Sequence, residues 1–328
     1  MAGYRGAGQR DHLFAMRTLV TGGAGFIGSA VADALLAEGH EVLAIDDFST
    51  GRLSNLDAAR REGRVKFHRF DIRSDGVAEI FAQAKPEVVF HLAAQPSVPA
   101  SVADPLRDAT VNVIGLLRVL DACVKTGVRK IVFASSGGTI YGRQRTLPVK
   151  ETVSGRPESP YGVTKKAAED YLRFYKVHHK LDFTSLALAN VYGPRQDPTG
   201  EAGVIAIFAS LLVRGSVATI NGNGEITRDY VYVEDVAEAF VRAGSDLASG
   251  QTVNIGTGKE TTLNELYSLM RKAAGFTEDA NYGPERPGDV PRSALDPAKA
   301  LKLLDWKPVT PLREGIKRTI DWFRPELG

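Results

Sequence analysis

The sequence predicts an α/β fold in which helices cover both faces of a doubly wound parallel sheet. From Arg17 to Asn190, short apolar runs rich in β-branched residues alternate with helical patterns. This alternation is typical of strand–helix–strand crossovers, and continuous apolar strands are typical of a sheet buried on both faces. After Asn190 the rhythm ends and glycine and proline become frequent. We therefore expect a smaller, mixed α/β portion toward the C-terminus.

These patterns place the individual elements. The expected strands cover residues 17–21, 41–46, 65–71, 88–91, 130–135 and 184–189. The expected helices cover residues 26–38, 75–84, 104–126 and 161–178, followed by 234–243, 263–274 and 312–323.

The composition excludes several classes of partner. The 328 residues carry 41 basic and 39 acidic side chains, a formal net charge of +2, which gives no reason to expect a nucleic acid or a membrane surface. The apolar run Val204–Val213 has only ten residues, too few to span a bilayer. Cys123 is the only cysteine, so no internal disulfide is possible and a cytoplasmic location is expected. We expect no metal ion.

A glycine-rich turn follows the first expected strand. Gly22, Gly25 and Gly28 form the pattern G-x-x-G-x-x-G where the strand gives way to an amphipathic helix. Glycines here permit a tight turn, close approach of the backbone to a pyrophosphate and close packing of helix on strand. Backbone N–H groups and the helix dipole then face the phosphates. The pattern predicts a dinucleotide site, although its spacing differs by one residue from G-x-G-x-x-G.

Acidic residues at the ends of the next two strands extend this site. Asp46 lies eighteen residues after Gly28, where a carboxylate accepts the ribose hydroxyls of the adenosine half and repels a 2′-phosphate. NAD is therefore expected rather than NADP, and Arg52 is the nearby cation that weakens this preference. Asp71 either lies beside the adenine or caps the end of its strand.

A tyrosine and a lysine follow the fifth expected strand. Tyr161 and Lys165 are four residues apart at the start of a helix, so their side chains share one face. The pKa of tyrosine is ordinarily near 10, and lowering it by about three units requires about 4 kcal/mol of preferential phenolate stabilisation. We expect the Lys165 ammonium and a positively charged nicotinamide ring to supply it. The phenolate can then take a hydroxyl proton while a hydride leaves the same carbon.

Seven motifs, in this order, resemble the extended short-chain dehydrogenase/reductase family: TGGAGFIG, DDFSTG, FHLAAQ, SSGGTIYG, the Tyr161–Lys165 pair, NVYGPRQ and TRDYVYVEDV. The resemblance runs from about Met16 to the C-terminus and is strongest to bacterial and archaeal UDP-glucose 4-epimerases with an SSGG-type motif. It implies a Rossmann fold, a bound NAD and a cycle of transient oxidation. In that cycle Tyr161 takes the proton of the sugar 4-hydroxyl, NAD takes the C4 hydride, and the hydride returns to the other face of the 4-keto sugar.

The resemblance also implies roles for individual positions. Lys165 would hold the nicotinamide ribose as well as assist Tyr161. The implied substrate contacts are Arg228 and Arg286 toward the diphosphate, Asn190 toward the diphosphate or the sugar, and Asp289 toward the uridine ribose. Ordinary surface charge is the alternative for the arginines. The further implied cofactor contacts are Phe26, Ile27, Asp71, Ile72, Leu92, Ala93, Ala94 and Gln95.

One position departs from the family pattern. Many relatives carry a catalytic serine or threonine four residues before the tyrosine of the VYG-like segment, here Tyr141, but this chain has Gly137 there. Ser136 and Thr139 are the candidates to bridge the sugar hydroxyl and Tyr161. The sequence does not choose between them.

The reaction and the sugar also have alternatives. A 4,6-dehydratase would be expected to carry an Asp–Glu pair where this chain has Gly138 and Thr139, which argues against water elimination. A UDP-glucuronate 4-epimerase would use the same catalytic residues. A non-catalytic NAD-binding sensor is the alternative from another class, but Tyr161 and Lys165 are both present. The residue that limits room at the sugar C2 in UDP-galactose epimerases is here Ser293, so we expect space for an N-acetyl group.

The chain is expected to divide into three parts. Residues 1–15 lack the apolar stretch of a signal peptide and are expected to form a flexible tail. Residues 16–193 are expected to bind NAD, with 230–256 returning to the same sheet. Residues 194–229 and 257–328 are expected to bind the substrate.

Two of the expected helices predict self-association. The helices over residues 104–126 and 161–178 are apolar over more than one face, whereas a helix that packs only on its own sheet needs a single stripe. The resemblance implies a homodimer formed through a bundle of these helices. The alternative is that the C-terminal part of the same chain covers them.

Overall fold

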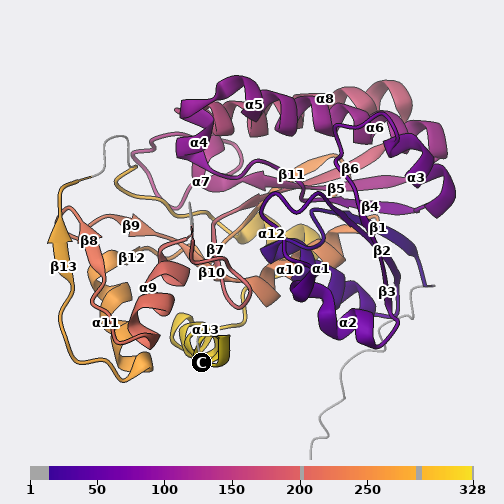
Figure 1. Cartoon of the computed structure of the whole chain (residues 1–328). Helices are drawn as coiled ribbons and strands as arrows, with labels where there is room; N and C mark the ends of the chain where they lie inside the picture. The colour runs from indigo at the N-terminus through magenta and orange to yellow at the C-terminus, as the bar shows by residue number, and fades with distance from the viewer. Residues whose placement is uncertain (1–14, 200–202, 286–289, 327–328) are drawn as a thin grey trace, which may run out of the picture.

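A parallel sheet of seven strands forms the centre of the larger part of the molecule (Figure 1). The computed structural model describes residues 15–199, 203–285 and 290–326. The strand order is β11-β6-β5-β4-β1-β2-β3, so the direction of winding reverses between β1 and β4 and a crevice forms beyond their carboxyl ends. This confirms the predicted fold class. The strands are β1 (Arg17–Thr21), β2 (Glu41–Asp46), β3 (Val65–Arg69), β4 (Val88–His91), β5 (Lys130–Ser136), β6 (Asp182–Leu188) and β11 (Gln251–Ile255).

Helices cover both faces of this sheet, and each face has its own apolar core (Figure 1). The layer drawn above the sheet contains α3 (Val77–Ala84), α4 (Val98–Ala103), α5 (Pro105–Ala109), α6 (Gly115–Thr126) and α8 (Pro160–His179). The layer drawn below it contains α1 (Phe26–Ala37), α2 (Asp57–Arg61), α10 (Val233–Ala243) and α12 (Ala298–Leu304).

A smaller portion with a third apolar core lies beside the sheet (Figure 1). Within the described ranges, no helix of either portion is long and apolar enough to cross a membrane. Three helices build the core of this portion: α9 (Val204–Val213), α11 (Leu263–Ala274) and α13 (Leu312–Glu326). Its short strands pair as β7 (Asn190–Tyr192) with β10 (Tyr230–Tyr232), β8 (Thr219–Asn221) with β13 (Asn281–Gly283), and β9 (Thr227–Arg228) with β12 (Thr261–Thr262).

Several predicted boundaries differ from the structure, and two of the differences have an identifiable reason. Strand β3 ends at Arg69 rather than at residue 71 because the Asp71 carboxylate accepts the backbone N–H of Arg73 at 2.8 Å and closes a turn. The helix predicted over residues 104–126 is not uniform. It begins as α5, passes through the π-helical turn Thr110–Ile114 and continues as α6.

Several elements were not predicted, and strand β11 and helix α9 show why. Strand β11 mixes polar and apolar residues, and its fully buried Asn254 accepts a hydrogen bond from the Tyr141 hydroxyl at 2.7 Å. A polar side chain with a buried partner leaves no apolar signal in the sequence. Helix α9 coincides with the apolar run that was considered only as a membrane span, and its apolar side chains fill the third core instead.

The chain that leaves α12 is bound to α10 on the sheet. The Trp306 indole is buried and donates a hydrogen bond to the backbone carbonyl of Asp235 at 2.7 Å. The Asp235 carboxylate in turn accepts the N–H groups of Val309 and Thr310 at 3.2 and 2.9 Å. These bonds and the packing of α12 attach a late segment of the chain to the sheet layer.

Leu304 and Leu301 test this attachment, because both lie on α12 but Leu304 is fully buried and Leu301 is 52% exposed. Leu304→Ala removes buried methyl groups and leaves a cavity, which typically costs about 2–5 kcal/mol. The exposed change Leu301→Ala typically costs about 0.5 kcal/mol or less. We expect calorimetry to show a melting temperature lowered by several degrees for Leu304→Ala only. Equal melting temperatures for the two variants would contradict the packing of α12.

Candidate active site

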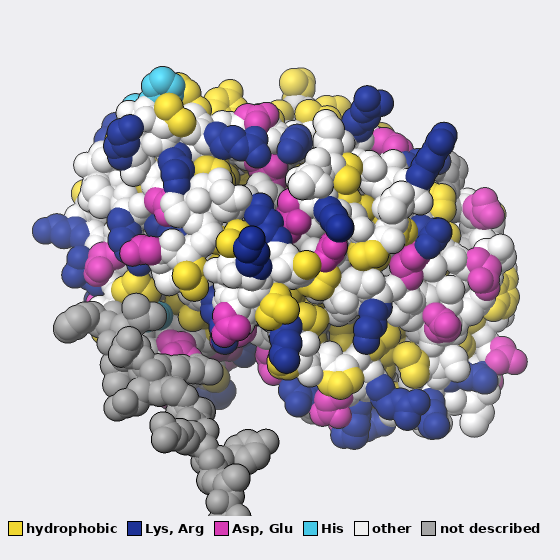
Figure 2. All heavy atoms as spheres, turned by 180° about the vertical axis from the view of Figure 1, so that it is seen from behind, with side chains coloured by type: hydrophobic (Ala, Val, Ile, Leu, Met, Phe, Trp, Pro, Cys, Tyr) yellow, Lys and Arg dark blue, Asp and Glu magenta, His cyan; other side chains and the backbone are white. Residues whose placement is uncertain are grey.

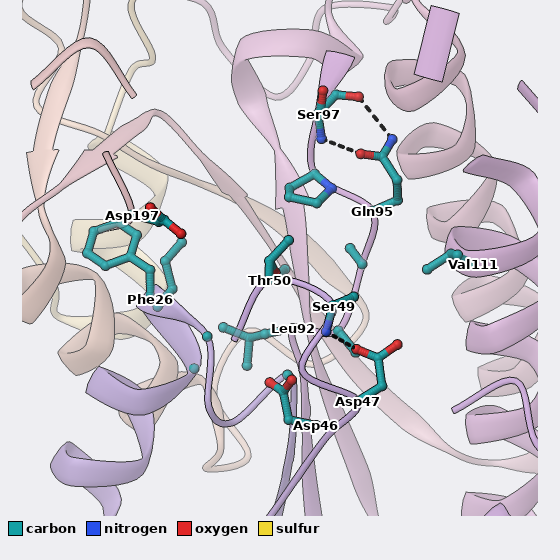
Figure 3. Close-up of a pocket in the computed structure, with 18 of the residues that line it drawn as sticks. Phe26, Asp46, Asp47, Ser49, Thr50, Leu92, Gln95, Ser97, Val111 and Asp197 are labelled. Carbon is teal, nitrogen blue, oxygen red and sulfur yellow. Dashed lines mark hydrogen bonds between the residues drawn. The ribbon is translucent and has the colours of Figure 1, made fainter. Parts of the chain in front are cut away.

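A cavity of about 710 Å³ opens beyond the carboxyl ends of β1, β2, β4 and β5, and part of its lining is drawn in Figure 3. Its volume falls within the range of about 300–1,000 Å³ that is usual for ligand pockets. A further wall comes from residues 195–199. The structure brings together in this cavity every residue predicted to contact the cofactor: Gly22, Gly25, Phe26, Ile27, Gly28, Asp46, Asp71, Ile72, Leu92, Ala93, Ala94, Gln95, Tyr161 and Lys165.

The glycine turn forms the floor of the cavity between β1 and α1. Gly22 has a φ of 69°, which favours glycine. A Cβ atom on Gly28 would lie 2.0 Å from the Gly22 carbonyl oxygen, so the two backbones can approach only because Gly28 has no side chain. Helix α1 starts at Gly25 with no side-chain cap. Its first N–H groups are therefore available to an anionic ligand.

Asp46 is fixed by main-chain donors at the end of β2. Its Oδ2 accepts the Ala24 N–H at 3.0 Å and its Oδ1 accepts the Phe48 N–H at 2.8 Å. Burial raises the pKa of this carboxyl group, while the two backbone hydrogen bonds act in the opposite direction. The neighbouring Asp47 also lines the cavity and accepts the Ser49 N–H at 2.8 Å (Figure 3). Two carboxylates thus face the position of a ribose bound at the end of β2.

Arg52 does not pair with Asp46. Its Nη2 donates to the Asp197 carboxylate at 2.9 Å across the cavity entrance. A guanidinium held by a carboxylate is poorly placed to take up a 2′-phosphate. The contact therefore removes the one sequence feature that weakened the preference for NAD.

Asp71 lines the cavity and pairs with Arg73. The guanidinium donates to both carboxylate oxygens, with Nη2–Oδ2 at 2.7 Å and Nε–Oδ1 at 3.0 Å. The hydrogen bond from Arg73 lowers the pKa of Asp71. Asp71 therefore makes the local contacts expected of a residue that caps the end of its strand. It also lines the cavity, so a position beside the adenine stays a prediction.

Tyr161 and Lys165 lie in the first two turns of α8, at the opposite end of the cavity from the loop after β2. Ser159 caps this helix by accepting the Gly162 N–H at 3.1 Å, and the Tyr161 N–H donates to Ser101 Oγ at 3.1 Å. The Lys165 ammonium donates to the Ala134 carbonyl oxygen at 2.8 Å and lies 5.7 Å from the centre of the Tyr161 ring. Both predicted side chains therefore face the same cavity.

For the protein chain by itself, the pKa of Tyr161 lies above its ordinary value. Burial raises it to about 12, a hydrogen bond with Ser136 acts in the opposite direction, and Lys165 is not among the charges that shift it. Burial also lowers the pKa of Lys165 to about 8. In the protein chain alone, desolvation has a larger effect on the pKa of Tyr161 than the positive charge of Lys165 was expected to have. Both side chains are buried in the same poorly hydrated part of the site.

The two candidate hydroxyls at the SSGG motif have different environments. Ser136 ends β5, and its side chain acts to lower the pKa of Tyr161 against the effect of burial. Thr139 lies in α7 (Gly137–Ile140) and makes a local hydrogen bond, donating to the Ser136 carbonyl oxygen at 3.3 Å. The structure therefore brings Ser136, and not Thr139, to the tyrosine.

Two residues predicted to contact the substrate, Asn190 and Arg228, do not line this cavity. Asn190 is exposed on β7. Arg228 lies on β9 and its Nη1 donates to the carbonyl oxygens of Thr227 at 2.8 Å and Val290 at 2.7 Å, so part of its guanidinium already serves the main chain. Arg286 and Asp289 lie outside the described residues, as do nearly all of residues 1–15.

Several cavity residues were not predicted. They come from the loops after β2 and β3, from α5 and from the segment after β7. The DDFSTG and NVYGPRQ motifs contain three of them, and only Arg52 was considered from the sequence. Gln196 is the most informative, because its buried Oε1 has no hydrogen-bond partner among the described residues. The others that matter to the argument are Asp47, Arg52, Arg73, Arg107, Arg195 and Asp197.

Comparison with known proteins agrees with this geometry. A family model described as GDP-mannose 4,6 dehydratase matches residues 19–319. A UDP-glucose 4-epimerase of Mycolicibacterium smegmatis is 49% identical over 309 residues, covering 94% of this chain and 99% of the relative. The structure of a Thermotoga maritima UDP-glucose 4-epimerase with UDP-glucose has 45% identity and a TM-score of 0.91, covering 95% and 99% of the two chains. A Thermus thermophilus UDP-glucose 4-epimerase in complex with NAD has 44% identity and a TM-score of 0.87, covering 94% and 99%.

The doubly wound sheet and the glycine turn define a dinucleotide-binding α/β protein. With the matches above, the chain belongs to the extended short-chain dehydrogenase/reductase family, among its NAD-dependent epimerases and dehydratases. The family predicted from the motifs is confirmed.

Gly28 gives a direct test of the cofactor site. Gly28→Ala places a methyl group against the Gly22 carbonyl oxygen and forces β1 and α1 apart. Gly138→Ala is the matched control, because a Cβ atom there meets no atom within 4 Å. We expect the NAD content of purified Gly28→Ala protein to fall about tenfold or more, with the control unchanged. A full complement of NAD in Gly28→Ala would contradict the assignment of the turn.

Proposed function

We propose that this protein is an NAD-dependent 4-epimerase of a UDP-sugar, with UDP-glucose and UDP-galactose as its main substrates. The observation that carries the proposal is the position of Tyr161 and Lys165 on one helix face at the end of a dinucleotide cavity. The similarity to UDP-glucose 4-epimerases over nearly the whole chain supports both the isomerase class and the cofactor. UDP-galactose is the product expected from inversion at C4 of UDP-glucose.

The cavity fits NAD. The uncapped start of α1 can bind a pyrophosphate, Asp46 can accept ribose hydroxyls, and Gln196 offers a buried acceptor that lacks a partner. When bound, NAD would take the hydride from the sugar C4 and return it. We propose that residues 16–193, with 230–256, bind this cofactor and that residues 194–229 and 257–328 bind the sugar nucleotide. Strand β11 beside β6 and α10 beside α1 support the first assignment.

Tyr161 is proposed to hold and release the proton of the sugar 4-hydroxyl at its phenolic oxygen. Since burial raises the pKa of Tyr161 to about 12, a phenolate at neutral pH requires positive charge beside the ring. Lys165 and the oxidised nicotinamide are the cations that the site offers. Ser136 is proposed to stabilise the phenolate and the sugar hydroxyl, in preference to Thr139, because Ser136 acts on the pKa of Tyr161 whereas the Thr139 hydroxyl donates to the Ser136 carbonyl oxygen.

The arrangement does not support a dehydratase. Water elimination needs an acid and a base beside the tyrosine. At the two positions where the dehydratase pattern has Asp and Glu, this chain has Gly138 and Thr139 in α7. Arg228 and Arg286 are proposed to bind the substrate diphosphate, Asn190 the diphosphate or the sugar, and Asp289 the uridine ribose.

We also propose a homodimer formed through α8 and the helices beside it. Apolar side chains of α8 are exposed along one face, and Leu106 of α5 is 82% exposed. Figure 2 shows hydrophobic side chains gathered along the edge formed by this helix layer. The described C-terminal residues leave this face uncovered, which favours a second copy over the alternative predicted from sequence. The exposed side chains on α8 are Val163, Tyr171, Phe174 and Val177.

The proposed cellular location rests on the state of the single cysteine. Cys123 is free and buried, and a thiol without a disulfide partner is typical of proteins of a reducing compartment. We therefore propose that the enzyme works in the cytoplasm.

A substrate panel tests the proposed reaction. Purified protein is incubated separately with UDP-glucose, UDP-galactose, their 2-acetamido counterparts and UDP-glucuronate, and the products are separated. We expect C4 interconversion of the first pair, and also of the acetylated pair because Ser293 is small. Tyr161→Phe removes the proton acceptor and is expected to lower kcat about 10²–10⁴-fold with NAD content unchanged. Absence of C4 inversion for every sugar would overturn the epimerase proposal.

Phe174→Glu tests the homodimer. A charge placed in an apolar interface has no partner and is costly to bury. We expect analytical ultracentrifugation to show a dimer for the wild type and a monomer for Phe174→Glu. Val309→Glu is the matched control, since Val309 is 70% exposed away from α8. A monomeric wild type, or a Phe174→Glu dimer of unchanged affinity, would refute this interface.

A further inference from the structure

Asp108 is a fully buried carboxylate at the end of α5, close to the cavity but outside its lining. Its Oδ1 accepts hydrogen bonds from Gln95 Nε2 at 2.8 Å and Asn112 Nδ2 at 3.0 Å. Its Oδ2 accepts one from Thr164 Oγ1 at 2.8 Å. Within residues 15–199, 203–285 and 290–326 it has no ion pair. A buried carboxylate is tolerated only when its oxygens are satisfied, so these three donors have to stay in place around it.

The three donors belong to the elements that surround the Tyr161 end of the cavity. Thr164 lies on α8 directly before Lys165, and its hydroxyl is also 3.0 Å from the Tyr161 carbonyl oxygen. Gln95 follows β4 and lines the cavity. Its backbone N–H donates to Asn112 Oδ1 at 2.8 Å, and Asn112 Nδ2 is 3.1 Å from its carbonyl oxygen. One carboxylate therefore links the catalytic helix, the cofactor loop and the helix between them.

The helix that carries Asp108 has a special form at this point. The π-helical turn Thr110–Ile114 starts two residues later and contains Asn112. Single π-helical turns are rare and occur frequently at functional sites. Here the turn brings the Asn112 amide within hydrogen-bonding distance of Asp108, Gln95 and Thr164 together. A regular α-helix can pack on a sheet without a π-helical turn, so packing alone does not explain the turn.

The charge of Asp108 also reaches the two reactive groups. It raises the pKa of Lys165 against the effect of burial, and it adds to burial in raising the pKa of Tyr161. The other titratable group facing Lys165 is His91 on β4. Burial, together with the Lys165 charge, lowers the pKa of His91 to about 3, so it stays neutral at neutral pH. Among the described residues, Asp108 is thus the carboxylate whose charge acts on both Tyr161 and Lys165.

We propose that Asp108 is a positioning residue for the reaction, which holds the first turns of α8 against the cofactor loop through Thr164, Asn112 and Gln95. The proposal rests on the proposed epimerase function. Asp108 touches neither substrate nor cofactor. It acts through the place and the charge of Tyr161 and Lys165.

Three variants separate position, charge and general packing. Asp108→Asn keeps the size of the side chain, removes the charge and turns one acceptor into a donor that faces other donors. Thr164→Val removes one hydrogen bond but keeps the charge and the branched shape. Asp121→Asn is the matched control, because Asp121 on α6 accepts a hydrogen bond from Tyr175, fourteen residues beyond Tyr161 on α8.

Steady-state kinetics with UDP-glucose are measured for each variant as a function of pH. We expect Asp108→Asn to lower kcat about tenfold or more while KM stays within about threefold. Loss of a nearby negative charge lowers the pKa of both Tyr161 and Lys165, so the whole pH profile of kcat is expected to move to lower pH by about half a unit or more. Thr164→Val is expected to lower kcat with no displacement of the profile. Asp121→Asn is expected to match the wild type.

Hydrogen–deuterium exchange gives a readout that does not depend on activity. We expect faster exchange of amides near Tyr161 in Asp108→Asn and Thr164→Val, and faster exchange only near Tyr175 in Asp121→Asn. The proposal would be overturned if Asp108→Asn had the kinetics and the exchange rates of the wild type, or if it lost kcat without a displacement of the pH profile. If Asp108→Asn does not fold, Thr164→Val takes its place, and wild-type kcat and exchange rates in Thr164→Val would overturn the proposal. An inactive wild type would instead refute the epimerase function, and the exchange data would still decide the role of Asp108.

Discussion

The close approach of two backbone segments at Gly22 and Gly28 is the constraint on which the rest of the site depends. With a Cβ distance of 2.0 Å to a carbonyl oxygen, Gly28 admits no side chain. The approach sets the start of α1 directly beyond β1. Ala24, inside the same turn, donates to Asp46 and accepts from the Arg52 N–H at 3.0 Å. These contacts join the ends of β1 and β2 and the loop after β2 into one unit. This unit determines the positions of the residues predicted to contact the cofactor.

At the other end of the cavity, burial opposes the charges that the chemistry needs. A phenolate and an ammonium both lose hydration there, which is why the pKa of Tyr161 lies above and that of Lys165 below its ordinary value. Positive charge brought by a ligand therefore has more effect on Tyr161 than it would in water. At neutral pH the protein chain by itself therefore holds Tyr161 in its protonated form.

Local rules were sufficient to predict much of the fold and the cofactor end of the site. Strands β1, β2 and β4 are continuous apolar runs, and the glycine turn and Tyr161–Lys165 pair are defined by spacing along one segment. The features that were missed depend on contacts between distant segments. Asn254 on β11 is satisfied by Tyr141, and Asp108 by Thr164, 56 residues away. Burial, which raises the pKa of Tyr161, is likewise a property of the folded chain and has no local signal in the sequence.

The cavity wall shows how the two portions of the molecule depend on each other. Arg195 has a φ of 71° and donates to Asp33 on α1 at 2.7 Å, and two residues later Asp197 binds Arg52. Partly exposed ion pairs of this kind contribute at most about 1 kcal/mol each to stability, so their main effect is on position. They place residues 195–199 of the smaller portion over the loop and helix that follow the glycine turn. The same contacts hold the Arg52 guanidinium on Asp197 rather than on Asp46.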